Sequence, residues 1–321
     1  MAERQPYLDF ERPIVELEKK ISDMKDFAVG GSVPLDSEIR SMQDKLEKLR
    51  KEVYSSLSRW QRVQLSRHPR RPHSIDYINM MCTDFIEIHG DRYFSDDKAL
   101  VGGFARIDGE PVLIVGQEKG RDTKQKLTRN FGMMHPEGYR KARRLFYLAE
   151  KFGLPIVILI DTPGAYPGIG AEERGQAEAI AKNIQVMFTI KVPIVIVVVG
   201  EGASGGALGI GVGDRVYILE YAWYSVISPE ACAAILWRDS ANAAEAAEAL
   251  RPTAETLLEF KIADQIIPEP EAGAHNDPEE TARRVKAVIS KTLAELKEKP
   301  VAELLSERLR KYRAIGEYRV M

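Results

Sequence analysis

The sequence is poor in cysteine and has no long apolar run. Its two cysteines, Cys82 and Cys232, stand far apart, without a second cysteine or a histidine at the spacing of a metal site. We therefore expect two buried thiols, no disulfide framework and no metal bound by this chain. No apolar stretch approaches the roughly 20 residues of a membrane-spanning helix, and no basic leader precedes an apolar core near the N-terminus. A cytoplasmic protein that does not enter a membrane is expected.

An excess of either charge is also missing. The 46 Lys and Arg residues against 48 Asp and Glu residues leave a formal net charge of −2, which gives no general attraction to nucleic acid or to a membrane surface. An anion site must therefore come from local clustering of charge. The chain does have 321 residues, of which 44% are hydrophobic, enough for one large domain with an appendage.

Apolar residues at helical spacing fill the N-terminal segment. They recur from Ile14 to Met24 and again from Ile39 to Leu57, and the turn-forming segment from Gly30 to Pro34 separates the two runs. This pattern predicts a helical hairpin over residues 1–60. Its apolar stripes can pair with each other and pack either on the same chain or on another subunit.

Strands and helices alternate along the rest of the chain, which indicates an α/β domain with parallel crossovers. We expect this main domain over residues 61–297 and a C-terminal helical tail over residues 298–321. The basic segment 59–73 is typical of a solvated connector, and His275 is expected at the surface. The predicted elements are a helix at 75–89, a hairpin of strands at 100–107 and 111–117 around Asp108-Gly109, a helix at 136–152, a strand at 155–161, a helix at 171–189, and strands at 193–199 and 215–219.

Two glycine-rich turns each follow a predicted buried strand and precede a helix. One runs from Val199 to Gly209 and the other from Ile160 to Gly170. Ligands of open α/β sheets lie at the carboxyl ends of the strands, so both turns are expected at one crevice. Glycine lets backbone N–H groups approach a ligand closely, and amides at a helix start can stabilise an oxyanion.

Three kinds of chemistry use such turns. A GTPase would need a GxxxxGK[ST] phosphate loop, which the sequence lacks. A serine hydrolase would use the GxSxG match from Gly202 to Gly206, with Ser204 as nucleophile and His275 as the only histidine after it. An oxyanion hole for an enolate would need no protein base, which agrees with the absence of clustered histidines and carboxylates near the turns. The candidate acids of the hydrolase are Asp214, Asp239 and Asp264.

A basic insert separates the hairpin strands from the next helix. Between Lys119 and Arg144 it holds nine basic residues and two acidic ones. Such clustering favours a multiply phosphorylated ligand such as coenzyme A, because arginine makes bidentate contacts to phosphate. A solvated helix face and a contact surface for an acidic partner subunit are the alternatives.

Further motifs accompany the turns in a fixed order. They are Asn130-Phe131-Gly132-Met133, Pro136 to Ala142, Ala171 to Gln176 and Tyr224 to Glu230. Together with the segments 161–168 and 200–214, they resemble the family of bacterial acetyl-CoA carboxylase carboxyltransferase α subunits over nearly the whole chain. One departure is Ala203, where glycine is expected in many relatives.

The resemblance implies a crotonase-like ββα spiral with an N-terminal helical hairpin and C-terminal helices. It also implies transfer of a carboxyl group from carboxybiotin to acetyl-CoA, giving malonyl-CoA in the first committed step of fatty acid biosynthesis. Biotin would be covalently held on a separate biotin carboxyl carrier protein, charged by biotin carboxylase, and a zinc-ribbon β subunit would complete an α₂β₂ heterotetramer. This chain alone would be inactive.

The same resemblance assigns roles to individual residues. The amides of Gly205 and Gly206 would stabilise the negative charge that develops on the biotin ureido oxygen. The biotin pocket would be shaped by Gly164, Ala165, Tyr166 and Pro167. The insert's Arg129 and Arg140 are the expected contacts to coenzyme A.

Overall fold

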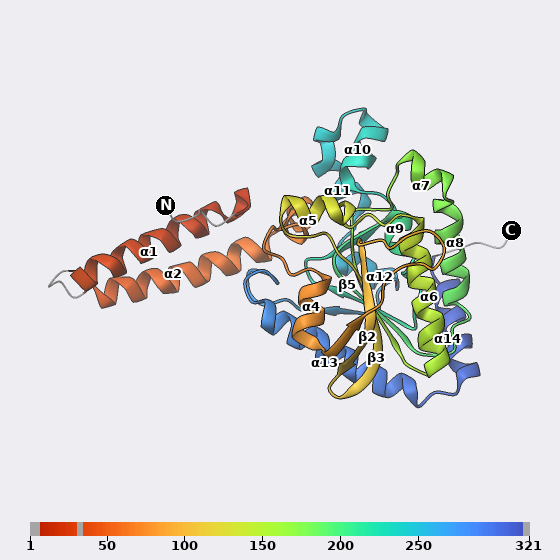
Figure 1. The fold of residues 1–321 in the computed structure, drawn as a ribbon. Helices are drawn as coiled ribbons and strands as arrows, with labels where there is room; N and C mark the ends of the chain where they lie inside the picture. The colour runs from red at the N-terminus through yellow and green to blue at the C-terminus, as the bar shows by residue number, and fades with distance from the viewer. Residues whose placement is uncertain (1–6, 31–34, 317–321) are drawn as a thin grey trace.

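The computed structural model describes residues 7–30 and 35–316 (Figure 1). The strands are β1 Thr83–Glu87, β2 Leu100–Ile107, β3 Glu110–Gln117, β4 Ile156–Thr162, β5 Ile194–Ala203, β6 Arg215–Leu219, β7 Trp223–Ser225 and β8 Gln265–Ile267. The helices are η1 Asp9–Glu11, α1 Arg12–Gly30, α2 Asp36–Ser55, α3 Arg59–Ser66, α4 Ser74–Met81, α5 Thr123–Thr128, η2 Asn130–Gly132, α6 Pro136–Phe152, α7 Ile169–Glu173, α8 Gln176–Met187, α9 Ser204–Leu208, α10 Pro229–Trp237, η3 Ser240–Asn242, α11 Ala243–Leu250, α12 Ala254–Glu259, α13 Pro278–Lys297 and α14 Val301–Arg313.

The strands form one mixed sheet in the order β1-β2-β3-β4-β5-β6-β8, and β7 pairs with the end of β5. The first three strands are antiparallel, whereas β3 to β6 and β8 run parallel. Each residue of β4 and β5 is buried, which is why these strands are continuous apolar runs rather than alternating ones. In Figure 1 the sheet lies between α4 and α13 on one side and α6 and α8 on the other.

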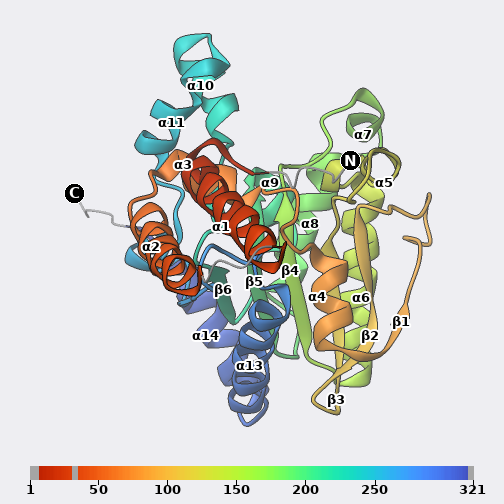
Figure 2. The same ribbon diagram turned by 90° about the vertical axis from the view of Figure 1, so that its left-hand side faces the viewer.

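The N-terminal hairpin of α1 and α2 projects from the main body, as Figures 1 and 2 show. Its root packs on the rest of the chain, where Ile14, Tyr54 and Leu57 form a cluster with Tyr221 and Ala272. The hairpin therefore contacts its own subunit at one end. Residues 31–34 of the predicted turn lie outside the described residues, and the domain limits at 60 and 297 stay predictions.

Three predicted segments differ from the structure: two helices and the basic connector. The helix predicted at 75–89 is wrong, because α4 ends at Met81 and the chain becomes the edge strand β1, paired with β2. The helix predicted at 171–189 is broken by Gly175, whose φ of 80° leaves the helical region.

The segment 59–73 is not a solvated connector. It forms α3, and the Arg71 guanidinium is buried in a double hydrogen bond to Glu269, with Nη1 to Oε2 at 2.8 Å and Nη2 to Oε1 at 2.6 Å. Of the two thiols, Cys232 is buried as expected, whereas Cys82 is half-buried. Burial raises the pKa of Cys82 to about 12. No helix in the described part of the chain is both long enough and apolar enough to cross a bilayer.

The last helix, α14, is held to the sheet by a buried arginine. Arg308 donates to both carboxylate oxygens of Asp214 at 2.8 and 2.7 Å. Its remaining N–H groups donate to the carbonyls of Met187, Ile190 and Val192. Asp214 also accepts the amide of Ile194 at 2.7 Å, so one ion pair joins α14 to the start of β5.

Candidate active site at two glycine turns

The two glycine turns meet, as the sequence predicts. They follow the adjacent parallel strands β4 and β5, whose register places Thr162 opposite Gly202. At Gly206 a Cβ atom would lie 2.3 Å from the carbonyl carbon of Gly164 and 2.5 Å from the amide nitrogen of Ala165. The two backbones therefore touch, and only glycine fits at position 206.

The turn after β5 presents backbone amides at the start of α9. Its entry residue Ser204 has a φ of 55°, a left-handed conformation that turns the chain sharply from strand to helix. Gly205 and Gly206 follow in the first turn of α9, where amides have no carbonyl partner within the helix. In the described part of the chain, no loop, cap or side-chain hydrogen bond is donated by either amide. Neither N–H group is therefore committed to an acceptor of these kinds within the described residues.

Buried side chains fix this turn from behind. The carbonyl of Gly206 accepts the Gln117 side-chain amide at 2.8 Å and the Tyr139 hydroxyl at 3.3 Å. The same Gln117 accepts the Asp161 amide at 3.3 Å through Oε1. Gln117 thus joins the ends of β3, β4 and β5 and aligns the two turns.

The turn after β4 is held open by Thr162 and by the unusual φ of 150° at Gly164. The Thr162 hydroxyl lies 2.7 Å from the carbonyl of Gly132 and 2.8 Å from that of Gly164. Beyond it, Tyr166 donates its amide to the carbonyl of Met134, and its ring contacts that of His135 at 4.2 Å between centroids with the planes tilted by 31°. Ala165 and Tyr166 are half-buried and Pro167 is exposed.

A buried charge network lies beneath both turns, and sequence reasoning missed it. Lys119 donates to Asp161 at 2.7 Å and to Glu201 at 2.6 Å. Glu201 also accepts Nε of Arg67 at 2.6 Å, and Arg67 pairs with Glu230. Burial alone would lower the pKa of Lys119, but the two carboxylates outweigh it and raise that pKa. The available signal was the position of Lys119, Asp161 and Glu201 at three strand ends.

A strained turn adjoins this network. Asn130, Phe131 and Gly132 have successive φ values of 46°, 56° and 82°, and left-handed conformations at residues other than glycine cost free energy and gather at functional sites. The exposed Phe131 ring, Lys119 and Asp161 line a cavity of about 290 Å³. The motif quoted in the sequence thus forms one wall beside the turns.

The basic insert is divided between structural and accessible residues. Lys141 is buried and donates to the carbonyl of Leu100 at 2.8 Å, and Lys119, with a side chain 14% exposed, is held by its two carboxylates. Arg129 donates to the carbonyl of Lys98 at 2.9 Å. Arg140 donates Nε to Asp91 at 3.0 Å and has a side chain only 10% exposed. The excess of positive charge in the sequence therefore overstates the charge that the insert offers to a ligand.

The hydrolase alternative loses its base. Ser204 is exposed at the turn, but the prediction that His275 lies at the surface is wrong. His275 is buried, stacks on His68 at 3.8 Å between ring centroids, and lies 3.5 Å from the Glu11 carboxylate. The other histidines also have partners elsewhere, His73 with Glu118, His89 with Asp96 and His135 with Asn130.

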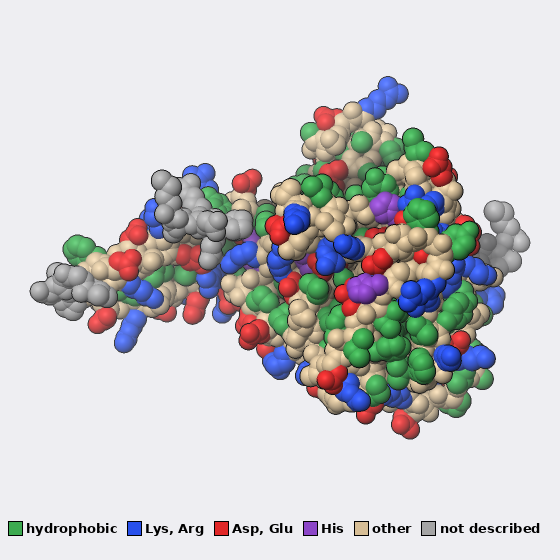
Figure 3. All heavy atoms as spheres, viewed as in Figure 1, with side chains coloured by type: hydrophobic (Ala, Val, Ile, Leu, Met, Phe, Trp, Pro, Cys, Tyr) green, Lys and Arg blue, Asp and Glu red, His purple; other side chains and the backbone are tan. Residues whose placement is uncertain are grey.

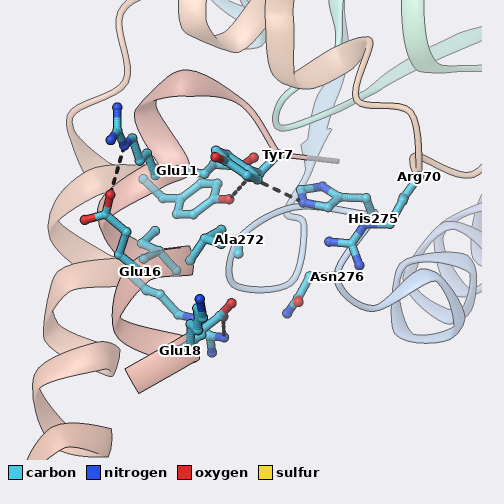
Figure 4. Close-up of a pocket in the computed structure, with 14 residues that line it drawn as sticks. Tyr7, Glu11, Glu16, Glu18, Arg70, Ala272, His275 and Asn276 are labelled. Atoms are coloured by element: carbon cyan, nitrogen blue, oxygen red, sulfur yellow. Dashed lines mark hydrogen bonds and ion pairs between the residues drawn. The ribbon is translucent and has the colours of Figure 1, made fainter. Parts of the chain in front are cut away.

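Glu11 and His275 line a cavity of about 690 Å³ between the hairpin root and the main body (Figure 4). His68 lies close to both of them. Glu11 accepts the Leu8 amide and the Tyr54 hydroxyl as well. These three side chains are close enough together to consider a metal site. Nδ1 of His68 accepts the Arg70 amide at 3.2 Å, so its proton sits on Nε2, the nitrogen that faces Glu11. With its proton on Nε2, His68 cannot use that nitrogen as a metal ligand, and Nε2 lies 3.9 Å from Oε2 of Glu11.

The charge on Glu11 makes the docking of the hairpin root dependent on pH. Burial opposes ionisation, but hydrogen bonds from His275, Leu8 and Tyr54 outweigh it and lower the pKa of Glu11 from 4.5 to about 2. Stabilisation from this carboxylate is therefore complete above about pH 4.5 and is lost as the pH falls towards 2.

We expect Glu11→Gln to lower the free energy of unfolding at pH 7 by roughly 2 kcal/mol, because hydrogen bonds to a charged group are lost. Urea unfolding of wild type and variant should give curves that converge between about pH 4.5 and pH 2. Glu16→Gln, at a residue whose side chain is 58% exposed, is the matched control and should change little at any pH. A difference that persists unchanged at low pH would contradict the ionised state of Glu11.

Comparison with known proteins places this geometry in a family. The family described as acetyl co-enzyme A carboxylase carboxyltransferase-like matches residues 7–316. The chain is 55% identical to the acetyl-coenzyme A carboxylase carboxyl transferase subunit alpha of Xanthomonas campestris pv. campestris (strain B100) over 312 residues, 97% of this chain and 98% of that protein. The corresponding subunit of Thermus thermophilus is 55% identical over 311 residues, again 97% of this chain and 98% of that protein.

Solved structures share the fold at low sequence identity. Transcarboxylase 12S matches with a TM-score of 0.57 at 22% identity. The match covers 72% of this chain and 43% of the transcarboxylase chain. The β subunit of Pseudomonas aeruginosa geranyl-CoA carboxylase has a TM-score of 0.56 at 19% identity over 73% of this chain and 44% of that one. The crotonase-like α/β fold implied by the motifs is confirmed. The chain therefore belongs to the acetyl-CoA carboxylase carboxyltransferase family.

Proposed function

We propose that this chain is the α half of a carboxyltransferase that moves a carboxyl group from carboxybiotin to acetyl-CoA and forms malonyl-CoA. The observation that carries the proposal is the contact between the two turns, beside which the amides of Gly205 and Gly206 stand in the first turn of α9 and donate no loop, cap or side-chain hydrogen bond within the described residues. A biotin ureido group suits this site because its oxygen can accept two N–H groups and its rings are compact and uncharged.

The residues of this chain bind and stabilise rather than exchange protons. When bound, carboxybiotin supplies the carboxyl group, and its ureido oxygen gains negative charge and can take the methyl proton of acetyl-CoA. The amides of Gly205 and Gly206 donate to that oxygen, an interaction that strengthens as the charge develops. Gly164, Ala165, Tyr166 and Pro167 form the opposite wall. Gln117 and the Lys119 network keep both walls in place.

The rest of the reaction depends on partners. We propose a β subunit with a zinc ribbon, which holds the thioester enolate and completes an α₂β₂ heterotetramer. A biotin carboxyl carrier protein, charged by biotin carboxylase, would deliver the carboxybiotin. Arg129 and Arg140 are the proposed contacts to the coenzyme A phosphates from this chain. No metal is assigned to the chain itself.

The assembly can be tested by mixing the purified chain with a carboxyltransferase β subunit. Malonyl-CoA-dependent carboxylation of free biotin, the reverse reaction, should appear only in the mixture. Propionyl-CoA tested beside acetyl-CoA in the forward reaction would give the acyl preference. A mixture that forms a stable complex but carries out neither reaction would contradict the proposal.

Ser204→Ala separates carboxyl transfer from hydrolysis. Transfer uses backbone amides, and Ser204 already has the left-handed conformation that alanine would adopt, so we expect the variant to keep activity within about fivefold, equivalent to about 1 kcal/mol. A serine-directed phosphonate should not label the wild type. Labelling at Ser204, together with loss of activity in the alanine variant, would instead support the hydrolase.

A further inference from the structure

The outer face of α6 carries an arginine-rich hollow that contains neither glycine turn. A cavity of about 460 Å³ is lined chiefly by Arg140, Arg143, Arg144, Arg174, Tyr93 and Tyr147, and we call it the arginine pocket. Its four arginines face two carboxylates, Asp91 and Glu178. Figure 3 shows Lys and Arg side chains gathered over α6 on this face of the molecule.

We propose that the arginine pocket binds a ligand through a phosphate group. The proposal goes beyond the proposed function, because three of its four arginines are not among the residues proposed for carboxyl transfer. It shares only Arg140 with the proposed contacts to coenzyme A. The phosphate could belong to that coenzyme or to a separate phosphorylated metabolite, and the chemistry of recognition is the same for both.

The negative charge of Asp91 is already used within the protein. Its Oδ1 accepts the amides of Tyr93 at 2.9 Å and Phe94 at 2.7 Å, and its Oδ2 accepts Nε of Arg140 at 3.0 Å. Burial would raise the pKa of Asp91, but these hydrogen bonds outweigh it and lower that pKa. Asp91 therefore shapes the loop and neutralises only one of the four arginines.

Two guanidinium groups retain buried donors without a hydrogen-bond acceptor. They are Nη2 of Arg140 and Nη1 of Arg143. The Arg140 side chain is 10% exposed, and its nearest further carboxylate, Glu137, lies 3.5 Å from Nη2. Arg143 makes no hydrogen bond or ion pair with any residue in the described ranges. Buried polar groups are rarely left unpaired, and an ion or ligand is a common reason when they are.

The other two arginines of the pocket, Arg174 and Arg144, are held in place by residues that do not line it. Arg174 lies over the Phe94 ring at 4.6 Å and pairs with Glu137 behind the pocket at 2.8 Å. Arg144 donates to the carbonyls of Gly90 and His89 at 3.0 and 2.8 Å. Burial, and then the charge of Arg92, lower the pKa of Arg144. Positive charge is therefore in excess here, and the groups are fixed before a ligand arrives.

This arrangement fits phosphate better than a carboxylate. A carboxylate has one charge and two oxygens, which a single guanidinium fork satisfies. The arginine pocket presents guanidinium groups from α6 and from the segment between α7 and α8. Its four arginines face Asp91 and Glu178 in the lining and Glu137 behind it, which leaves one positive charge in excess. A phosphate group, with three or four oxygens, matches the number of guanidinium donors better than a carboxylate does. The exposed ring of Tyr93, over which Arg140 lies at 5.1 Å, adds an apolar edge.

The test uses inorganic pyrophosphate as the probe and isothermal titration of the full chain. We expect saturable binding of pyrophosphate. Arg143→Met should raise the dissociation constant roughly tenfold to a hundredfold, because it removes hydrogen bonds to a charged group. Because Arg143 has no partner to lose, this variant should fold normally, which its thermal midpoint checks. Arg283→Met, at a residue 70% exposed on α13, is the matched control and should bind like the wild type.

Competition identifies the source of the phosphate. If coenzyme A displaces pyrophosphate, the pocket holds phosphates of the coenzyme, and Arg143→Met should raise the KM for acetyl-CoA in the complex with the β subunit. If coenzyme A does not displace pyrophosphate, the ligand is a separate phosphorylated metabolite, and carboxyl transfer by the variant should match wild type. Absence of pyrophosphate binding at about 5 mM, or equal binding by wild type and Arg143→Met, would overturn the proposal even if carboxyl transfer is intact.

Discussion

Gly206→Val is expected to abolish carboxyl transfer in the complex with the β subunit, with a loss of about 1000-fold or more. One misplaced oxyanion donor costs about 100- to 1000-fold in rate, and this substitution displaces two turns together. A Cβ at position 206 would lie 2.3 Å from the carbonyl carbon of Gly164, and backbone atoms cannot yield as a flexible side chain can. The measurement is malonyl-CoA-dependent carboxylation of biotin.

Gly205→Ala is the matched comparison. A Cβ at position 205 would meet only the Ile180 side chain, at 3.5 Å, which is an ordinary contact. The amide of residue 205 stays in place, so we expect a loss of no more than about tenfold, well below the effect of one missing donor. Equal losses at the two positions would mean that bulk in the turn, rather than contact between the turns, decides activity. Binding to the β subunit should be unchanged in both variants.

Lys119→Met is expected to destabilise the protein by about 3–5 kcal/mol, the usual cost of removing one partner from a buried ion pair. Asp161 and Glu201 would remain buried without the ammonium group that now lies within 2.7 Å of each. Activity should fall more steeply than stability, because these two carboxylates lie at the strand ends that carry the turns. Urea unfolding measures the loss of stability. The carboxylation assay, run at a temperature at which the variant is folded, measures the loss of activity.

The control for this variant is Lys124→Met, in the same basic insert but exposed. Removal of an exposed charge usually changes stability by less than about 0.5 kcal/mol. If Lys119→Met and Lys124→Met unfolded at the same urea concentration, the network beneath the turns would contribute nothing to stability. If Lys119→Met were unstable but fully active at low temperature, the network would have no part in positioning the turns.

Elements with strong local signals could be predicted from the sequence. The helix α6 begins at Pro136 and ends at Phe152, and the next residue, Gly153, caps it in a left-handed conformation with a φ of 65°. Both limits could be predicted because proline is common at the start of a helix and glycine just after its end. The edge strand β1 was missed, because it exists through pairing with β2 rather than through its own pattern. Propensity over five residues is a weak guide when tertiary pairing decides the structure.

In the candidate site, too, features with a local sequence signal could be predicted and features that depend on distant segments could not. Glycine turns after apolar strands are visible in the sequence, so the meeting of the two turns could be predicted. The role of Lys119 could not, because a buried paired lysine and an exposed one are identical in sequence, and this residue was counted among candidate phosphate contacts. His275 was misplaced for a related reason, since its partners Glu11 and His68 come from distant segments.

The ion pair between Arg308 and Asp214 has a consequence for how the newly made polypeptide matures. Asp214 is synthesised nearly a hundred residues before Arg308. Until Arg308 has been made, the Asp214 carboxylate lacks the cationic partner that it has in its buried position beside the start of β5. The ion pair can therefore close only after α14 has been made, well after β5 and β6 themselves. Completion of this part of the fold depends on a segment distant in the chain.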